Sequence, residues 1–262
     1  MSARMLEGRK VLVVGAGTRP LPEDADDSPL GNGRAIAVVA AREGAEVACA
    51  DIDAASAAET ARLIEAEGAS AHVLAGDVAQ PAECERLVAE AQEAMDGLDG
   101  LVCNVGIGAG MGLSGTTPEQ WDSVFAVNVR SHFLLAAAAL PLMAEGGSIV
   151  FISSIAGLTA GSRIPAYDAS KSALTGLCRQ VAAEGARRGV RANVVAPGLI
   201  DTPLGRWATG GRPSRAKAPV PLGRQGTAWE VAEPVVFLLS DRASYITSQL
   251  LAVDGGLTGC RG

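Results

Sequence analysis

Short apolar runs alternate with helix-like segments from one end of the chain to the other, and this alternation restricts the possible folds most. Strands are predicted at 10–14, 46–50, 71–75, 98–103, 148–152, 191–195 and 250–253. Helices are predicted at 33–43, 54–67, 165–188 and 227–239, and others begin at Pro81 and Thr117. Strands that alternate with helices form a parallel sheet covered on both faces. With right-handed crossovers, the prediction is an α/β fold with one doubly wound Rossmann-type sheet of about seven strands.

The size and charge of the chain point to one domain and exclude several classes of protein. A length of 262 residues with 48% hydrophobic residues fits a single domain over 1–262. The net charge of −7 gives no basic field for nucleic acid. The longest apolar run, Phe133–Met143, is too short to span a bilayer, so we expect a buried helix end there and no membrane insertion. The N-terminal residues lack the apolar stretch of a signal peptide.

The cysteines and histidines predict no metal site. The five cysteines are scattered without a CxxC pattern, and the two histidines lie far apart. We therefore expect neither a disulfide framework nor a Cys/His metal centre, and a reducing, cytoplasmic location.

Two segments interrupt the alternation. Residues 19–30 form a proline-containing acidic insertion within the glycine-rich loop, for which we expect a flap near the phosphates of a nucleotide. Residues 202–229 carry five basic residues and no acids, and a mobile loop is expected. Its part 202–226 is expected to be a substrate-binding lid whose basic residues meet a substrate anion, although a plain solvated loop is an equal alternative.

The first strand ends in a glycine-rich turn suited to a dinucleotide. Gly15, Gly17 and Thr18 follow the strand, and Gly31, Asn32 and Gly33 open the next helix, whose free N–H groups favour a pyrophosphate. Asp51 follows the second strand at the spacing expected for a ribose-binding acid, and its charge favours NAD over NADP. Alternatively Asp51 caps the helix that begins near Ala54, although Asp53 is the better cap. Arg19 is the one candidate here for pairing with a 2′-phosphate.

Tyr167 and Lys171 lie four positions apart on a predicted helix, hence on one face. A nearby ammonium favours the phenolate, which tunes tyrosine for acid–base work. Ser154, after the fifth strand, is placed to hold the substrate oxygen, and Asn128 to order a water chain to Lys171. Each residue also has an ordinary interpretation, a chance pair on a helix surface or a serine turn, but the combination at one end of the sheet indicates catalysis.

With these residues the chain resembles the short-chain dehydrogenase/reductase family over nearly its whole length. The further motifs that carry the resemblance are Gly76-Asp77-Val78, Cys103-Asn104-Val105-Gly106, Val127-Asn128-Val129, Pro197-Gly198-Leu199-Ile200-Asp201-Thr202 and Val253-Asp254-Gly255-Gly256. The insertion at 19–30 departs from the family pattern.

The resemblance implies an NAD(H)-dependent oxidoreductase that interconverts a secondary alcohol and a ketone, with Tyr167 as acid/base and Asn128, Ser154 and Lys171 completing the tetrad. It implies cofactor contacts at Gly15, Gly17, Thr18, Gly31, Asn32, Gly33, Asp51, Ile52, Asp77, Val78, Asn104, Gly106, Tyr167, Lys171, Pro197, Gly198, Ile200 and Thr202. It also implies a small-molecule substrate and a homotetramer or homodimer. The alternative is a catalytically idle dinucleotide-binding sensor or scaffold.

Overall fold

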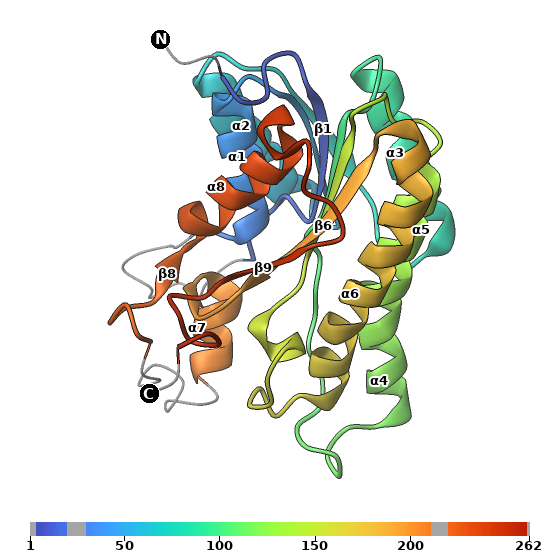
Figure 1. The fold of residues 1–262 in the computed structure, drawn as a ribbon. Helices are drawn as coiled ribbons and strands as arrows, with labels where there is room; N and C mark the ends of the chain where they lie inside the picture. Colours follow the sequence, from blue (N-terminus) through green and yellow to red (C-terminus); the bar gives the residue numbers. More distant parts are fainter. Residues whose placement is uncertain (1–3, 20–29, 211–219, 261–262) are drawn as a thin grey trace.

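A seven-stranded parallel sheet forms the centre of the computed structural model, which describes residues 4–19, 30–210 and 220–260 (Figure 1). The strand order is β3-β2-β1-β4-β5-β6-β9. The strands are β1 Lys10–Val14, β2 Glu46–Asp51, β3 Ala71–Ala75, β4 Gly100–Cys103, β5 Ser148–Ile152, β6 Arg191–Pro197 and β9 Leu250–Val253. The predicted fold class is therefore confirmed. The order reverses between β1 and β4, and the crevice outside such a reversal is where these sheets bind ligands.

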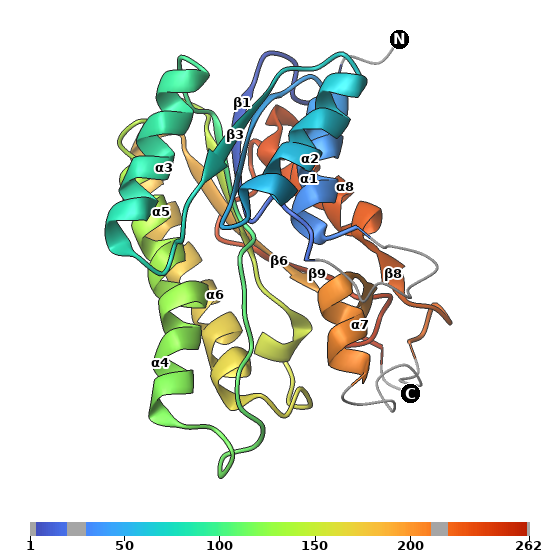
Figure 2. The same ribbon diagram turned by 180° about the vertical axis from the view of Figure 1, so that it is seen from behind.

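Helices cover both faces of the sheet (Figures 1 and 2). One layer contains α1 Asn32–Arg42, α2 Ala54–Ala66 and α8 Ala228–Leu239, and the other contains α3 Pro81–Ala94, α5 Ser131–Ala139 and α6 Pro165–Gly185. Helix α4, Pro118–Phe125, leads through a π-helical turn, Ala126–Arg130, into α5. Each layer closes an apolar core dominated by Ala, Val, Leu and Ile.

Local signals set the helix starts. Pro81 is the first residue of α3, and Thr117 and Gln120 form a capping box at α4, as Thr227 and Glu230 do at α8. None of the described helices is long and apolar enough to cross a bilayer.

The expectation of a buried end for Phe133–Met143 is wrong in part. Helix α5 ends at Ala139, and Phe133 and Leu142 are 52% and 46% exposed. The run is apolar all round, but α5 packs on the sheet with one face only.

The expectation of a loop over 202–229 is wrong for residues 203–210 and 226–229, whereas residues 220–225 lie outside helices and strands as expected. Helix α7 spans Pro203–Gly210, and the short strands β7 Ile200–Asp201 and β8 Gly226–Thr227 pair beside it. The Thr202 hydroxyl accepts a hydrogen bond from Gly205 N at 3.0 Å, as an N-cap does. The sequence Thr202-Pro203 therefore repeats the helix-start signal of Thr117-Pro118. Residues 20–29 of the acidic insertion (19–30) and residues 211–219 of the expected lid lie outside the described residues.

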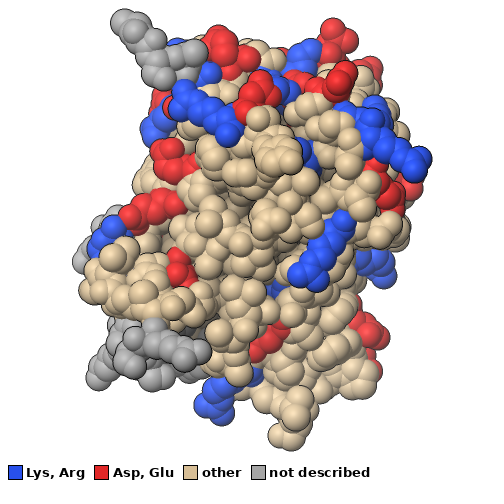
Figure 3. Space-filling view, viewed as in Figure 1, with Lys and Arg blue, Asp and Glu red and all other residues tan. Residues whose placement is uncertain are grey.

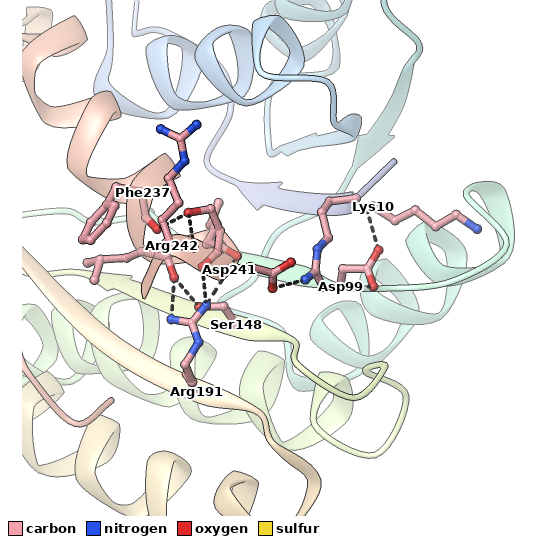
Figure 4. A network of polar contacts seen from close by, with 11 residues as sticks. Lys10, Asp99, Ser148, Arg191, Phe237, Asp241 and Arg242 are labelled. Carbon is pink, nitrogen blue, oxygen red and sulfur yellow. Dashed lines mark hydrogen bonds and ion pairs between the residues drawn. The ribbon is translucent and has the colours of Figure 1, made fainter. Parts of the chain in front are cut away.

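A buried arginine joins the amino end of the sheet to the end of α8 (Figure 4). The Arg191 guanidinium donates hydrogen bonds to the carbonyls of Leu238 at 2.7 Å and Ser240 at 3.0 Å, with longer contacts to those of Leu239 and Ile246. The Ser148 hydroxyl donates to the same Leu238 carbonyl at 2.9 Å. Since the last carbonyls of a helix lack partners within it, Arg191 satisfies groups that burial would otherwise leave unpaired.

Candidate active site

Two cavities lie side by side at the carboxyl edge of the sheet. One, of about 420 Å³, is bordered by the glycine turn after β1 and by the ends of β2 and β4. The other, of about 750 Å³, lies between the segment after β5, the start of α6 and helix α7. Both are lined by Asn32, Ser153, Tyr167, Thr202 and Leu204. The two cavities therefore share part of their walls, and we call the smaller one the narrow cavity and the larger one the wide cavity.

The glycine turn brings the backbone of β1 against the start of α1. Gly15 has φ +85°, and a Cβ placed on Gly33 would lie 1.8 Å from the Gly15 carbonyl oxygen, so both positions require glycine. The Asn104 amide donates to that carbonyl at 2.9 Å and fixes the turn. Helix α1 begins at Asn32 with Gly31 as an N-cap that offers no side-chain bond. The first N–H groups of α1 therefore stay available, which suits the binding of a pyrophosphate in the narrow cavity.

Asp51 lies at the end of β2 in the narrow cavity. Its carboxylate accepts hydrogen bonds from Gly17 N at 2.8 Å and Asp53 N at 3.1 Å. It does not cap α2, because Asp53 accepts from Ala55 N and Ser56 N instead. Ile52, Asp77 and Val78 line the same cavity.

Two arginines lie in this region, and Arg19 lines the narrow cavity itself. The guanidinium of Arg19 lies 6.0 Å from the centre of the Trp207 ring. Arg34, which the sequence reasoning did not single out, donates to Thr60 Oγ1 at 2.9 Å and to the Ser56 carbonyl at 3.0 Å.

Tyr167 and Lys171 meet in the first turns of α6. Lys171 Nζ lies 5.8 Å from the centre of the Tyr167 ring and donates to the Ile152 carbonyl at 2.9 Å and, more weakly, to the Val105 carbonyl at 3.5 Å. The lysine is 3% exposed, and burial lowers its pKa to about 8. At neutral pH most of it still carries the positive charge that favours a phenolate.

Asn128 and Ser154 lie beside this pair. Asn128 is fully buried in the π-helical turn, where Oδ1 accepts from Ile107 N at 2.8 Å and Nδ2 donates to the Ile107 carbonyl at 2.9 Å and to Ser170 Oγ at 3.0 Å. Its side chain thus holds the loop that contains Gly106. Ser154 Oγ accepts from Ala156 N at 3.2 Å, which leaves the hydroxyl proton available to a substrate oxygen in the wide cavity.

The segment after β6 closes the wide cavity. Pro197, Gly198, Ile200 and Thr202 all line it. A Cβ on Gly198 would lie 2.6 Å from Asp254 Cα, so this glycine lets the chain pass the Val253–Gly256 turn.

Three further polar residues support or border the cleft. The Ser153 hydroxyl donates to the Lys171 carbonyl and the Ser170 hydroxyl to the Tyr167 carbonyl, both at 2.7 Å. Sequence reasoning treated Ser153 only as half of a serine pair and did not identify Ser170. Arg163, on the rim of the wide cavity, was also missed, and no sequence pattern marks it.

Replacing Lys171 by Met is expected to stabilise the protein at pH 7, by on the order of 1–2 kcal/mol. Burial lowers the pKa from 10.5 to about 8, which corresponds to about 3 kcal/mol at ~1.4 kcal/mol per unit, and the lost hydrogen bonds offset part of it. Because the folded-state pKa is the lower one, the unfolded chain binds more protons between pH 8 and 10.5, and wild-type stability rises across that window. The difference in free energy of unfolding between Lys171→Met and wild type should therefore become smaller from pH 7 to pH 10.

Urea denaturation at both pH values measures this difference, with Lys10→Met as the matched control. The Lys10 ammonium donates to the Asp96 carbonyl in an exposed contact, so no comparable gain is expected. A Lys171→Met protein that is less stable than wild type by the same amount at both pH values would contradict the expectation.

Comparisons with known proteins agree with this geometry. A family model described as Enoyl-(Acyl carrier protein) reductase matches residues 29–258. The 2-(S)-hydroxypropyl-CoM dehydrogenase 3 of Xanthobacter autotrophicus is 40% identical over 87% of this chain and 92% of its own length. The inactive 2-(S)-hydroxypropyl-CoM dehydrogenase 2 of the same organism is 42% identical, over 85% and 99%.

A solved structure gives the same result. A short-chain dehydrogenase/reductase from Burkholderia xenovorans superposes with a TM-score of 0.90 at 35% identity, covering 99% of this chain and 100% of that one. The fold, the length matched and these relatives lead to one conclusion: the chain belongs to the short-chain dehydrogenase/reductase family of oxidoreductases.

Proposed function

We propose that this chain is an NAD(H)-dependent oxidoreductase that interconverts a secondary alcohol and a ketone, with Tyr167 as the acid/base. The observation that carries the proposal is the position of Tyr167. Its side chain lines both cavities and has the Lys171 ammonium 5.8 Å from its ring centre. A proton donor at the junction of a dinucleotide cleft and a substrate cavity is what carbonyl reduction requires.

The proposed mechanism follows from the hydrogen bonds of the site. NADH, when bound, would supply the hydride. Tyr167 gives its phenolic proton to the carbonyl oxygen, while Ser154, whose Oγ already accepts from Ala156 N, donates its own proton in a hydrogen bond to that oxygen. Lys171 stabilises the phenolate that results. In the oxidising direction Tyr167 takes the hydroxyl proton back.

Asn128 has a positioning role in this mechanism. Both ends of its amide hold the Ile107 backbone, and Nδ2 also reaches Ser170. A Cβ on the neighbouring Gly106 would lie 3.0 Å from Lys171 Nζ, so this loop packs directly on the ammonium. Asn128 thereby keeps the loop against Lys171 and supports the proton relay.

The cofactor contacts follow the narrow cavity. Gly15, Gly17, Thr18, Gly31, Asn32 and Gly33 would hold the pyrophosphate, and Asp51 the adenosine ribose. Ile52, Asp77 and Val78 would contact the adenine. Asn104, Gly106, Tyr167, Lys171, Pro197, Gly198, Ile200 and Thr202 would hold the nicotinamide half. All of these residues line one or both cavities.

Asp51→Ala is expected to reverse the preference for NADH over NADPH. A carboxylate accepts hydrogen bonds from the ribose hydroxyls and repels a 2′-phosphate, so its loss should lower kcat/KM with NADH by about 10-fold to 100-fold. The efficiency with NADPH should rise. Initial rates with both cofactors give the ratio of kcat/KM with NADH to kcat/KM with NADPH.

Asp53→Ala is the matched control for this change. It removes the cap of α2, which costs about 1 kcal/mol of stability, but leaves the ribose acid in place. A wild-type enzyme that uses NADPH at least about tenfold more efficiently than NADH would contradict the role of Asp51.

The test of the function is a panel of secondary alcohols and ketones with NAD(H) and NADP(H), followed by the absorbance of the reduced cofactor. Turnover of at least one pair is expected. A carbonyl compound consumed without net change in the cofactor would indicate a different reaction on the same fold.

A catalytically idle dinucleotide-binding sensor or scaffold is the second candidate, because one relative of 42% identity carries the name inactive. In this chain all four residues of the tetrad are present, which favours catalysis. Intact NADH binding with no turnover on the whole panel would support the idle protein.

We also propose self-association, as a homotetramer or homodimer. The face that carries β9, α8 and part of α6 has a wide area without charged side chains (Figure 3). Leu251 on the edge strand β9 is 41% exposed, and Phe133 on α5 is half exposed. Light scattering on the purified protein gives the oligomeric state.

A further inference from the structure

The wide cavity contains one charged side chain among its described lining residues, and that side chain is a cation. Its wall consists of apolar and small polar residues with Ser154 and Tyr167 on one side and Leu204 and Trp207 on the other. No described acid lines it. Arg163 is the exception, on the rim next to the start of α6.

The Arg163 guanidinium has no hydrogen bond or ion pair with another described side chain or carbonyl. Two other described arginines near this end of the molecule are neutralised. Arg206 donates to Asp201 through bonds of 2.7 and 2.9 Å, and Arg224 donates to Glu230 through bonds of 2.8 and 2.6 Å. Arginine presents a planar set of donors that matches a carboxylate, sulfonate or phosphate. Within the described part of the chain this guanidinium has no acidic partner and the cavity wall has no acid, so the site is suited to such an anion.

The backbone at Arg163 has a strained conformation. Its φ is +63°, an uncommon conformation for a residue with a Cβ. Two hydrogen bonds enforce it: Ile164 N donates to Ser162 Oγ at 2.9 Å, and Gly112 N donates to the Arg163 carbonyl at 2.8 Å. Strained residues that their surroundings hold in this way concentrate at ligand-binding sites.

Arg163 also lies close to the reacting atoms along the chain. It precedes Tyr167 by four residues, which span at most about 14 Å even when fully extended. Both residues also line the wide cavity, so one molecule in that cavity can contact both side chains.

We propose that Arg163 selects the substrate, which is a short ketone or secondary alcohol carrying a terminal anionic group. The inference rests on the proposed function of Tyr167 and specifies the substrate class for the same site. Arg163 holds the anion while Tyr167 and Ser154 hold the carbonyl oxygen.

The test compares keto acids with their uncharged methyl esters. The probes are 3-oxobutanoate, 4-oxopentanoate and 5-oxohexanoate, each with its ester, reduced with NADH. Acetone substituted on one methyl carbon by sulfonate or by phosphate distinguishes the kinds of anion. One variant is Arg163→Asn, which removes the charge and tolerates a positive φ. The other is Arg163→Lys, which keeps the charge but lacks the planar set of donors that binds an anion through two hydrogen bonds.

Wild type is expected to reduce the best anionic probe about 10-fold to 100-fold more efficiently than its neutral counterpart. In Arg163→Asn this ratio should fall to about one, because KM for the anionic probes rises while kcat and the kinetics with the esters stay unchanged. The ratio for Arg163→Lys should lie between those of Arg163→Asn and wild type. High salt should weaken the preference for the anion because ions screen an exposed pair.

The outcomes distinguish a failure of substrate selection by Arg163 from a failure of the oxidoreductase function. Esters reduced as efficiently as acids by wild type, or an Arg163→Asn protein that loses both equally, would overturn the selection by Arg163 while the oxidoreductase function stands. No turnover of any probe, together with no turnover on the wider panel, would overturn both.

Discussion

Tyr167→Phe is expected to lower kcat by about a thousandfold while NADH binding stays within about twofold of wild type. The ring stays, so the shape of both cavities and the contact with Lys171 are preserved. The hydroxyl is lost, and with it the proton that the forming alkoxide needs. Rates from NADH absorbance and binding from NADH fluorescence separate the two effects.

The chain provides its own control for this change. It has two tyrosines, and the other, Tyr245, is fully exposed beyond α8. Tyr245→Phe should keep wild-type kcat and wild-type stability. A Tyr167→Phe enzyme that works within about threefold of the wild-type rate would remove the acid/base role and the mechanism built on it.

Arg191→Leu is expected to lower the free energy of unfolding by about 3–4 kcal/mol and the melting temperature by roughly 10 °C. Leucine fills part of the volume but donates nothing, so the carbonyls at the end of α8 that Arg191 contacts stay buried without this donor (Figure 4). Arg191 begins β6, whereas the site lies at the carboxyl ends of the strands. The folded variant should therefore retain its kcat at low temperature.

Arg188→Leu is the matched control. Arg188 also binds carbonyls near a helix end, those of Leu140 and Met143 after α5, but it does so at the surface. Water replaces those donors, so a loss below about 1 kcal/mol is expected. Equal losses in the two variants, read by chemical denaturation, would show that burial is not what makes Arg191 important.

The sequence was sufficient to predict the strands and most of the sheet-covering helices, because their apolar periodicity is strong. Six of the seven predicted strands begin at the residue predicted, and β4 begins at Gly100 rather than Leu98. Tyr167, Lys171, Ser154 and Asp51 were placed at one edge of the sheet by chain order alone, and the structure brings them together there.

Other features depend on contacts that no local pattern encodes. The strand order is set by how the layers pack. Helix α7 was missed because the glycines and prolines around it outweighed the Thr202-Pro203 signal. Arg163 has no sequence motif, since its importance comes from the cavity beside it and from the absence of a described acid on the wall.

The wall that the two cavities have in common has a thermodynamic consequence. Thr202 and Leu204, at the start of α7, face both cavities, as Asn32 does from α1. A molecule that settles these side chains from one cavity reshapes the other, so the two binding equilibria are coupled. By reciprocity, the factor by which dinucleotide tightens substrate binding equals the factor by which substrate tightens dinucleotide binding.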